Sequence, residues 1–106
     1  MSDHALAEGL AGLASRVDNL SHLTAGAESR TLEDQEDRLA KLTLVAIVVD
    51  MDATNAKYRD AVKRVQAAID AIGNADKKIQ NVAQVIAGVA KALDVAEKLL
   101  AKAAGV

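Results

Sequence analysis

The segment DMDATN, which begins at Asp50, has the side-chain spacing that opens a calcium-binding loop. In such a loop the first, third and fifth residues supply oxygen ligands, and here they are Asp50, Asp52 and Thr54. The match then fails, because Asn55 stands where the loop needs glycine and the twelfth residue is Ala61 instead of a bidentate glutamate. The pattern therefore favours a polar kink or the solvated edge of a helix, and we expect no metal ion.

The two histidines, His4 and His22, are also poor candidates for a site. On one helix they would share a face, but about 27 Å would separate them along the axis, so they cannot bind one ligand. The chain has no cysteine, no HxxxH or Glu-x-x-His pair and no glycine-rich phosphate loop. We therefore expect a protein that is not an enzyme and that binds no cofactor.

Asn55 is the unusual residue among the apolar positions, because it falls between Met51 and Tyr58 in a helical seam. A lone polar residue in a seam often fixes the register or the oligomeric state of a coiled coil. The alternative is an asparagine that faces solvent at an irregularity of the helix. Tyr58 is a candidate hydrogen-bond partner of Asn55, and a ligand contact is the less favoured role.

Basic side chains are concentrated near the end of the chain. The last 46 residues carry seven basic residues (Lys and Arg) and four acidic ones (Asp and Glu). The first 60 residues carry six basic residues and eleven acidic ones. An acidic helix beside a basic one explains this asymmetry. Because aromatic side chains do not alternate with the basic ones, we expect no nucleic-acid partner. Contact with an anionic lipid surface is the alternative, and its candidate residues are Lys91, Lys98 and Lys102.

The composition indicates that helices position all of these side chains. The chain has 106 residues, 51% of them hydrophobic, with no Pro, Cys, Trp or Phe, and Ala is about a fifth of the total. This predicts a single all-α domain over residues 1–106. The absence of cysteine gives no indication of an oxidising compartment, and the N-terminus lacks the pattern of a secretory signal. We therefore expect the cytoplasm as the default location, and export without a signal peptide is the alternative.

Heptad spacing predicts the first helix, over about residues 4–24. Its apolar positions are spaced 4, 3, 4 and 3, and they are Leu6, Leu10, Leu13, Val17 and Leu20. Gly26 suggests a turn before a second helix over about 31–72, with Thr31 as its N-cap. Its first two turns hold Glu33, Asp34, Glu36 and Asp37, where carboxylates oppose the positive end of the helix dipole.

The second helix should end at Gly73 and be followed by a third, over about residues 76–104. A continuous second helix would be about 60 Å long, and a break near 50–55 is the alternative. The two helices are expected to form an antiparallel coiled-coil hairpin. Its seam residues are Leu44, Val48, Met51, Asn55, Tyr58, Val62, Val65, Ile69 and Ile72, facing Ile79, Val82, Ile86, Val89, Leu93 and Leu100.

An uncharged apolar run extends from Leu42 to Val49, between Lys41 and Asp50. It is too short to span a membrane, and no other segment alternates with the period of a partner strand. Two seams on nearly opposite faces of the helix overlap in this run, so we expect neighbours on both sides. One neighbour would be the third helix, and the other the first helix or another copy of the chain.

These patterns predict a non-enzymatic helical interaction or assembly protein that works through coiled-coil seams and self-associates. Its partners would be a second copy or another helical protein. The alternative is a membrane-active or membrane-associated amphipathic helical protein, such as a toxin-like or phage-type component. The two hypotheses differ in whether the apolar stripe of the third helix packs against the second helix or is accessible to lipid.

Overall fold

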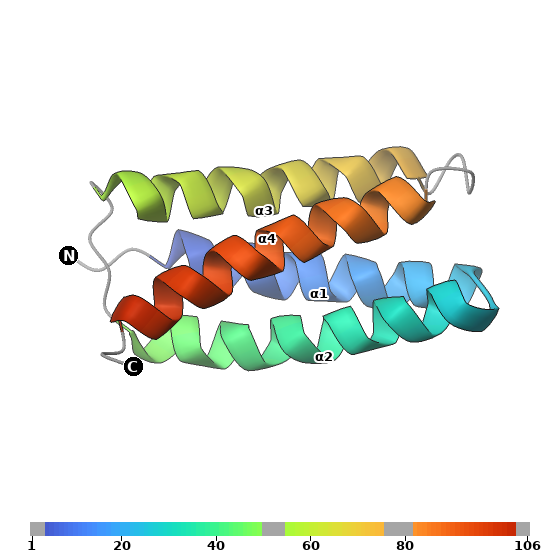
Figure 1. Ribbon diagram of the computed structural model, residues 1–106, viewed down its shortest axis with the longest axis horizontal. Helices are drawn as coiled ribbons and strands as arrows, with labels where there is room; N and C mark the ends of the chain where they lie inside the picture. Colours follow the sequence, from blue (N-terminus) through green and yellow to red (C-terminus); the bar gives the residue numbers. More distant parts are fainter. Residues whose placement is uncertain (1–3, 50–54, 76–81, 104–106) are drawn as a thin grey trace.

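The computed structural model describes residues 4–49, 55–75 and 82–103. These residues form α-helices with no strand among them (Figure 1), and the helices are α1 (Ala5–Leu23), α2 (Gly26–Val48), α3 (Ala56–Ala75) and α4 (Val82–Ala103). The prediction of an all-α fold is confirmed. The prediction of three helices is wrong, because the expected middle helix is two helices.

The four helices pack as a bundle of two antiparallel hairpins (Figure 1). One hairpin is α1 with α2, and the other is α3 with α4. The hairpins lie side by side, so that α1 packs against α3 and α2 against α4, each pair running in the same direction. Among the described residues, no Cα atom of α1 lies within 8 Å of one in α4, and none of α2 lies within 8 Å of one in α3. The connection from α2 to α3 therefore joins helices on opposite corners of the bundle.

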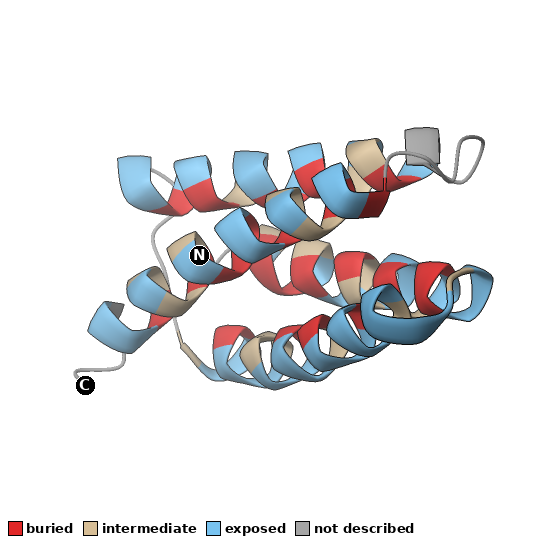
Figure 2. Ribbon diagram, turned by 45° about the vertical axis from the view of Figure 1, so that its right-hand side comes forward, coloured by how far each residue is buried: buried red, intermediate tan, exposed pale blue. Residues whose placement is uncertain are grey.

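Apolar side chains from all four helices meet in one core, which Figure 2 shows as the facing buried sides of the ribbons. The predicted heptad positions of α1 are all buried. α3 and α4 contribute alternating small and large side chains, which let their backbones approach each other. The buried residues of these two helices are Tyr58, Ala61, Val65, Ala68 and Ile72 with Val82, Val85, Val89, Ala92, Leu93, Ala96 and Leu100.

The α1–α2 turn explains why the second helix begins earlier than predicted. Gly26 has a φ of 69°, a left-handed conformation that glycine adopts without a Cβ clash and that allows a short turn. The carbonyl oxygens at the end of α1 accept hydrogen bonds from the Thr24 and Ser29 hydroxyls. Thr31 is not an N-cap, because it lies within α2 and its hydroxyl donates to the Ala27 carbonyl at 2.9 Å.

The expected middle helix stops at Val48, and Val49 is extended, with φ −79° and ψ 124°. α3 then begins at Ala56, with Asn55 as its N-cap. The Asn55 Oδ1 accepts hydrogen bonds from the backbone N–H groups of Lys57 (2.9 Å) and Tyr58 (3.2 Å). The expectation of one helix over 31–72 is therefore corrected to two helices, α2 and α3, on either side of the alternative break near 50–55. Residues 50–54 lie outside the described residues.

Two polar contacts connect the hairpins along α2 and α4. The Gln35 side chain is buried, and its Nε2 donates to the Ile86 carbonyl at 3.0 Å. Nearer the C-terminus of α4, the Arg38 guanidinium forms an ion pair with Glu97. The first contact lies near the start of α4, and the second lies where the C-terminal part of α4 meets α2. The position of that C-terminal part determines the shape of the candidate site.

Candidate functional site

Most of the predicted seam lies inside the bundle. Its buried members are Tyr58, Val65, Ile72, Val82, Val89, Leu93 and Leu100, and its partly buried members are Val62, Ile69 and Ile86. Met51 and Ile79 lie outside the described residues. The seam residues of α3 and α4 are therefore used by the protein's own core.

The first two seam residues lie elsewhere. Leu44 and Val48 are 67% and 83% exposed, so they do not pack against the last helix as expected. The reason is geometric, because Val48 follows the buried Leu39 by nine residues and so points about 180° away from it. Asn55 is also exposed and serves as a cap, so it is not a buried register residue.

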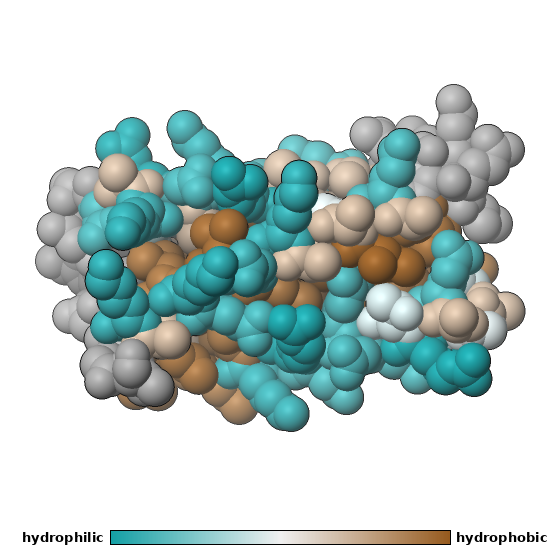
Figure 3. Space-filling model, viewed as in Figure 1, coloured by the Kyte–Doolittle hydropathy of each residue, from teal (hydrophilic) through white to brown (hydrophobic). Residues whose placement is uncertain are grey.

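Four aliphatic side chains form an exposed cluster on the last two turns of α2. Together with Leu44 and Val48 it includes Val45, which is 38% exposed, and Ile47, which is 55% exposed. We call this cluster the α2 patch. In Figure 3 hydrophobic atoms appear along the lower left edge, where α2 ends. Exposed aliphatic clusters of this kind are characteristic of interaction surfaces.

A shallow pocket of about 350 Å³ adjoins the α2 patch between α1 and α2. Ile47 belongs to both the patch and the pocket. The other lining residues are His4, Ala7, Glu8, Ala11 and Thr43. The pocket therefore extends the apolar surface of α2 toward the start of α1, with a histidine and a glutamate beside it.

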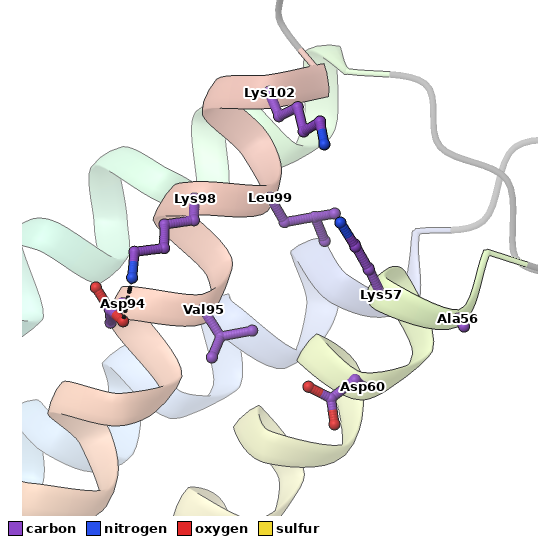
Figure 4. Close-up of a pocket in the computed structure, with 8 residues that line it drawn as sticks. All are labelled: Ala56, Lys57, Asp60, Asp94, Val95, Lys98, Leu99 and Lys102. Atoms are coloured by element: carbon purple, nitrogen blue, oxygen red, sulfur yellow. Dashed lines mark ion pairs between the residues drawn. The ribbon is translucent and has the colours of Figure 1, made fainter.

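A larger pocket, of about 500 Å³, lies between the start of α3 and the end of α4 (Figure 4). We call it the α3–α4 groove. Its apolar lining comes from Ala56, Val95 and Leu99, and its charged lining from Lys57, Asp60, Asp94, Lys98 and Lys102. Lys98 and Lys102 were predicted as candidate lipid contacts, whereas Lys57 was not predicted as a site residue. The predicted antiparallel hairpin contained the missing signal, because it placed residues near Tyr58 beside residues near Leu100.

The candidate lipid-binding lysines are separated by the fold. Lys98 and Lys102 line the α3–α4 groove, whereas Lys91 is exposed on α4 and does not line it. The apolar stripe of α4 packs in the core from Val82 to Leu100, with most of its members buried and Ile86 partly buried. In the part of the chain that the structure describes, each helix is too short or too polar to cross a membrane.

The described titratable groups do not assemble into a metal site. No three His, Asp or Glu side chains among them are close enough together to hold a metal ion, and the calcium-like segment from Asp50 to Thr54 lies outside the described residues. His4 and His22 are exposed at opposite ends of α1. Partial burial raises the pKa of Glu36, and the neighbouring negative charge of Asp18 on α1 raises it further.

Comparison of the chain with protein-family models, with curated proteins and with solved structures finds no match in any of the three.

Proposed function

We propose that this protein is a non-enzymatic helical interaction protein that self-associates through the α2 patch. The observation that carries the proposal is the exposure of Leu44, Ile47 and Val48 on α2. The opposite face of this helix packs in the core. None of the described residues covers these side chains, so a second molecule is needed to bury them. Burying them would remove apolar surface from water, which is the main favourable term in protein association.

A second copy is the partner that the patch fits best. When two molecules pair about a twofold axis, the same patch lies on both sides of the interface, so each aliphatic cluster covers the other. The patch is short, because charged Asp37 and Lys41 occupy the outer face of the preceding turns. A small interface of this kind supports weak association, with a Kd in the micromolar range or above.

The bundle changes the reason for self-association. A two-helix hairpin by itself would bury too little apolar surface and would need further copies of the chain. In the folded chain α1 and α2 cover the hairpin of α3 and α4, so the core is shared by four helices of one molecule. Self-association in this proposal therefore depends on the α2 patch and not on an incomplete core.

A membrane surface is the competing partner, and the packing of α4 weighs against it. The competing hypothesis needs the apolar stripe of α4 to face lipid while its lysines contact anionic headgroups. That stripe lies in the core from Val82 to Leu100. Lipid binding through α4 would require the bundle to open, whereas pairing through the α2 patch leaves it intact.

Sedimentation velocity over protein concentrations from about 1 µM to about 1 mM tests the proposal. The wild-type protein should shift from monomer to dimer, and Leu44→Glu with Val48→Glu should keep it monomeric. Leu23→Glu is the matched control, since Leu23 is 56% exposed at the other end of α1, away from the patch. A wild-type protein that stays monomeric throughout, or a dimer that the patch variant leaves unchanged, would overturn the proposal.

Flotation with anionic and neutral liposomes distinguishes a membrane surface from a second copy as the partner. The proposal predicts that the protein stays at the bottom of the gradient with both kinds of vesicle. Protein that floats with anionic vesicles and that loses flotation in the Leu44→Glu, Val48→Glu variant would assign the patch to lipid instead of to a second copy.

A further inference from the structure

The α3–α4 groove exists because α4 diverges from α3 toward the C-terminus of α4. In Figure 1 α4 begins beside the end of α3 and crosses the bundle so that its last turns lie nearer to α2. The Arg38 guanidinium of α2 forms an ion pair with Glu97 in this part of α4. The first turn of α3 is therefore left without close cover from α4, and a pocket of about 500 Å³ opens between them.

The inner lining of the groove is aliphatic. Val95 and Leu99 are only partly buried although they pack against the core, and Ala56 on α3 is exposed beside them. Figure 4 shows Val95 and Leu99 extending from α4 into the space between the two helices. A hydrocarbon chain placed there would cover apolar atoms that now face the groove.

The charged lining of the groove has an excess of positive charge. The Lys98 ammonium group is 3.1 Å from an Asp94 oxygen, and the Asp60 carboxylate is 3.0 Å from Nε of Arg64, outside the groove. Lys57 and Lys102 form no ion pair with a described residue. Figure 4 shows their side chains extending from the two helices into the same mouth of the groove. Two such ammonium groups favour a negatively charged group between them.

From this geometry we infer that the α3–α4 groove binds a monomeric fatty-acid anion, with its carboxylate between Lys57 and Lys102 and its chain against Val95 and Leu99. The volume falls within the range of about 300 to 1,000 Å³ that is common for small-ligand pockets. A small inorganic anion would leave the aliphatic lining exposed, and a neutral alkane would leave the two lysines unpaired. A ligand with both a chain and an anionic head satisfies both parts of the groove.

This site is separate from the surface proposed for self-association. The residues of the α2 patch do not line the α3–α4 groove, and the groove residues come from the other hairpin. Ligand binding and self-association can therefore be removed independently by substitution.

Calorimetric titration of the full-length protein with decanoate, at concentrations below micelle formation, tests the inference. Saturable binding of one decanoate is expected, with little binding of decanol or inorganic phosphate. Lys57→Gln with Lys102→Gln should weaken decanoate binding about tenfold. Lys91→Gln is the matched control, because Lys91 is exposed on α4 and does not line the groove, and its affinity should be unchanged.

A second variant tests the chain-binding part. Ala56 is exposed at the first position of α3, so Ala56→Phe can fill the groove without removing a charge or a core side chain. It should abolish decanoate binding while helix content and thermal stability stay close to wild type. The inference is overturned if decanoate does not bind, if decanol binds equally well, or if Ala56→Phe binds like wild type. It is also overturned if the Leu44→Glu, Val48→Glu variant loses decanoate binding, since the ligand would then occupy the α2 patch.

Discussion

The Tyr58 hydroxyl on α3 accepts a hydrogen bond from the backbone N–H of Leu6 on α1, with 3.1 Å between nitrogen and oxygen, in the interior of the bundle. The first N–H groups of a helix have no acceptor within that helix. His4, which precedes α1, makes no side-chain cap. A side chain from the other hairpin therefore accepts a hydrogen bond from one of the free N–H groups at the start of α1. This hydrogen bond connects the two hairpins.

Tyr58→Phe should lower the free energy of unfolding by about 1 to 2 kcal/mol, because it keeps the buried ring but leaves the Leu6 N–H without this acceptor. Urea unfolding followed by circular dichroism measures the change. Thr31→Val is the control, since it removes an exposed hydroxyl that bonds within its own helix. An equal loss in both variants, or no loss in Tyr58→Phe, would contradict a structural role for this hydrogen bond.

Asn55→Ala should lower the free energy of unfolding by about 1 kcal/mol, because the two N–H groups that Asn55 Oδ1 caps lose their acceptor. Asn55→Asp should retain the wild-type value, since a carboxylate also caps and opposes the helix dipole. Thermal unfolding of both variants gives the comparison. A buried register residue would behave differently, because replacing it with an apolar side chain would raise stability.

Gln35→Met should raise the free energy of unfolding by about 1 kcal/mol. The Gln35 Oε1 is buried and accepts no hydrogen bond from a described residue, whereas Met fills similar space without a buried acceptor. The bond from Nε2 to the Ile86 carbonyl is lost, but it contributes less than the unsatisfied oxygen costs. Gln66→Met, at an exposed site on α3, should have little effect when measured by the same urea titration.

Glu36→Gln should stabilise the protein at pH 7 and have a smaller effect in acid. Burial and the charge of Asp18 raise the folded-state pKa of Glu36, so the carboxyl group binds its proton more tightly in the folded state. Its contribution to stability is therefore present at low pH and is lost as the pH rises through the raised pKa. Unfolding free energies measured between about pH 3 and pH 7 should converge at the acidic end. Curves that stay parallel would show that Glu36 is not responsible.

Val65→Asp should unfold the bundle or lower the unfolding free energy by more than about 2 kcal/mol, since Val65 is 1% exposed and a carboxylate there has no charged partner in the core. A Cβ on Gly9 of α1 would lie 3.1 Å from Val65, so the site also has no room for water. Ala67→Asp, on the exposed face of the same helix, should fold normally. Equal melting temperatures for the two variants would contradict the packing of α3.

Periodicity predicted the parts of the fold that depend on local pattern. The heptad positions of α1, such as Leu10 and Leu13, are buried as expected, and α3 and α4 pack side by side in opposite directions. The start of α2 was missed because a Thr followed by acidic residues is typical of an N-terminus, whereas the positive φ at Gly26 reverses the chain five residues earlier.

The candidate sites could not be predicted in the same way, because they depend on which helices become neighbours. The apolar run that ends at Val49 predicted neighbours on both sides of the helix. Because the middle helix ends at Val48, the outer side of α2, with Leu44 and Val48, is exposed. The α3–α4 groove combines Lys57 with Lys102, which are 45 residues apart in the sequence. Its width follows from the position of α4 against α2, which a helical pattern does not encode.

The order of the helices has a consequence for assembly. Each hairpin contributes its own share of the core, and the chain passes from one hairpin to the other once, between Val48 and Ala56. The hairpin of α1 and α2 from one molecule can therefore pack on the hairpin of α3 and α4 from another with the same buried contacts. This is the geometry of domain swapping, in which a closed monomer and an exchanged dimer share one core and differ in the path of a single connection.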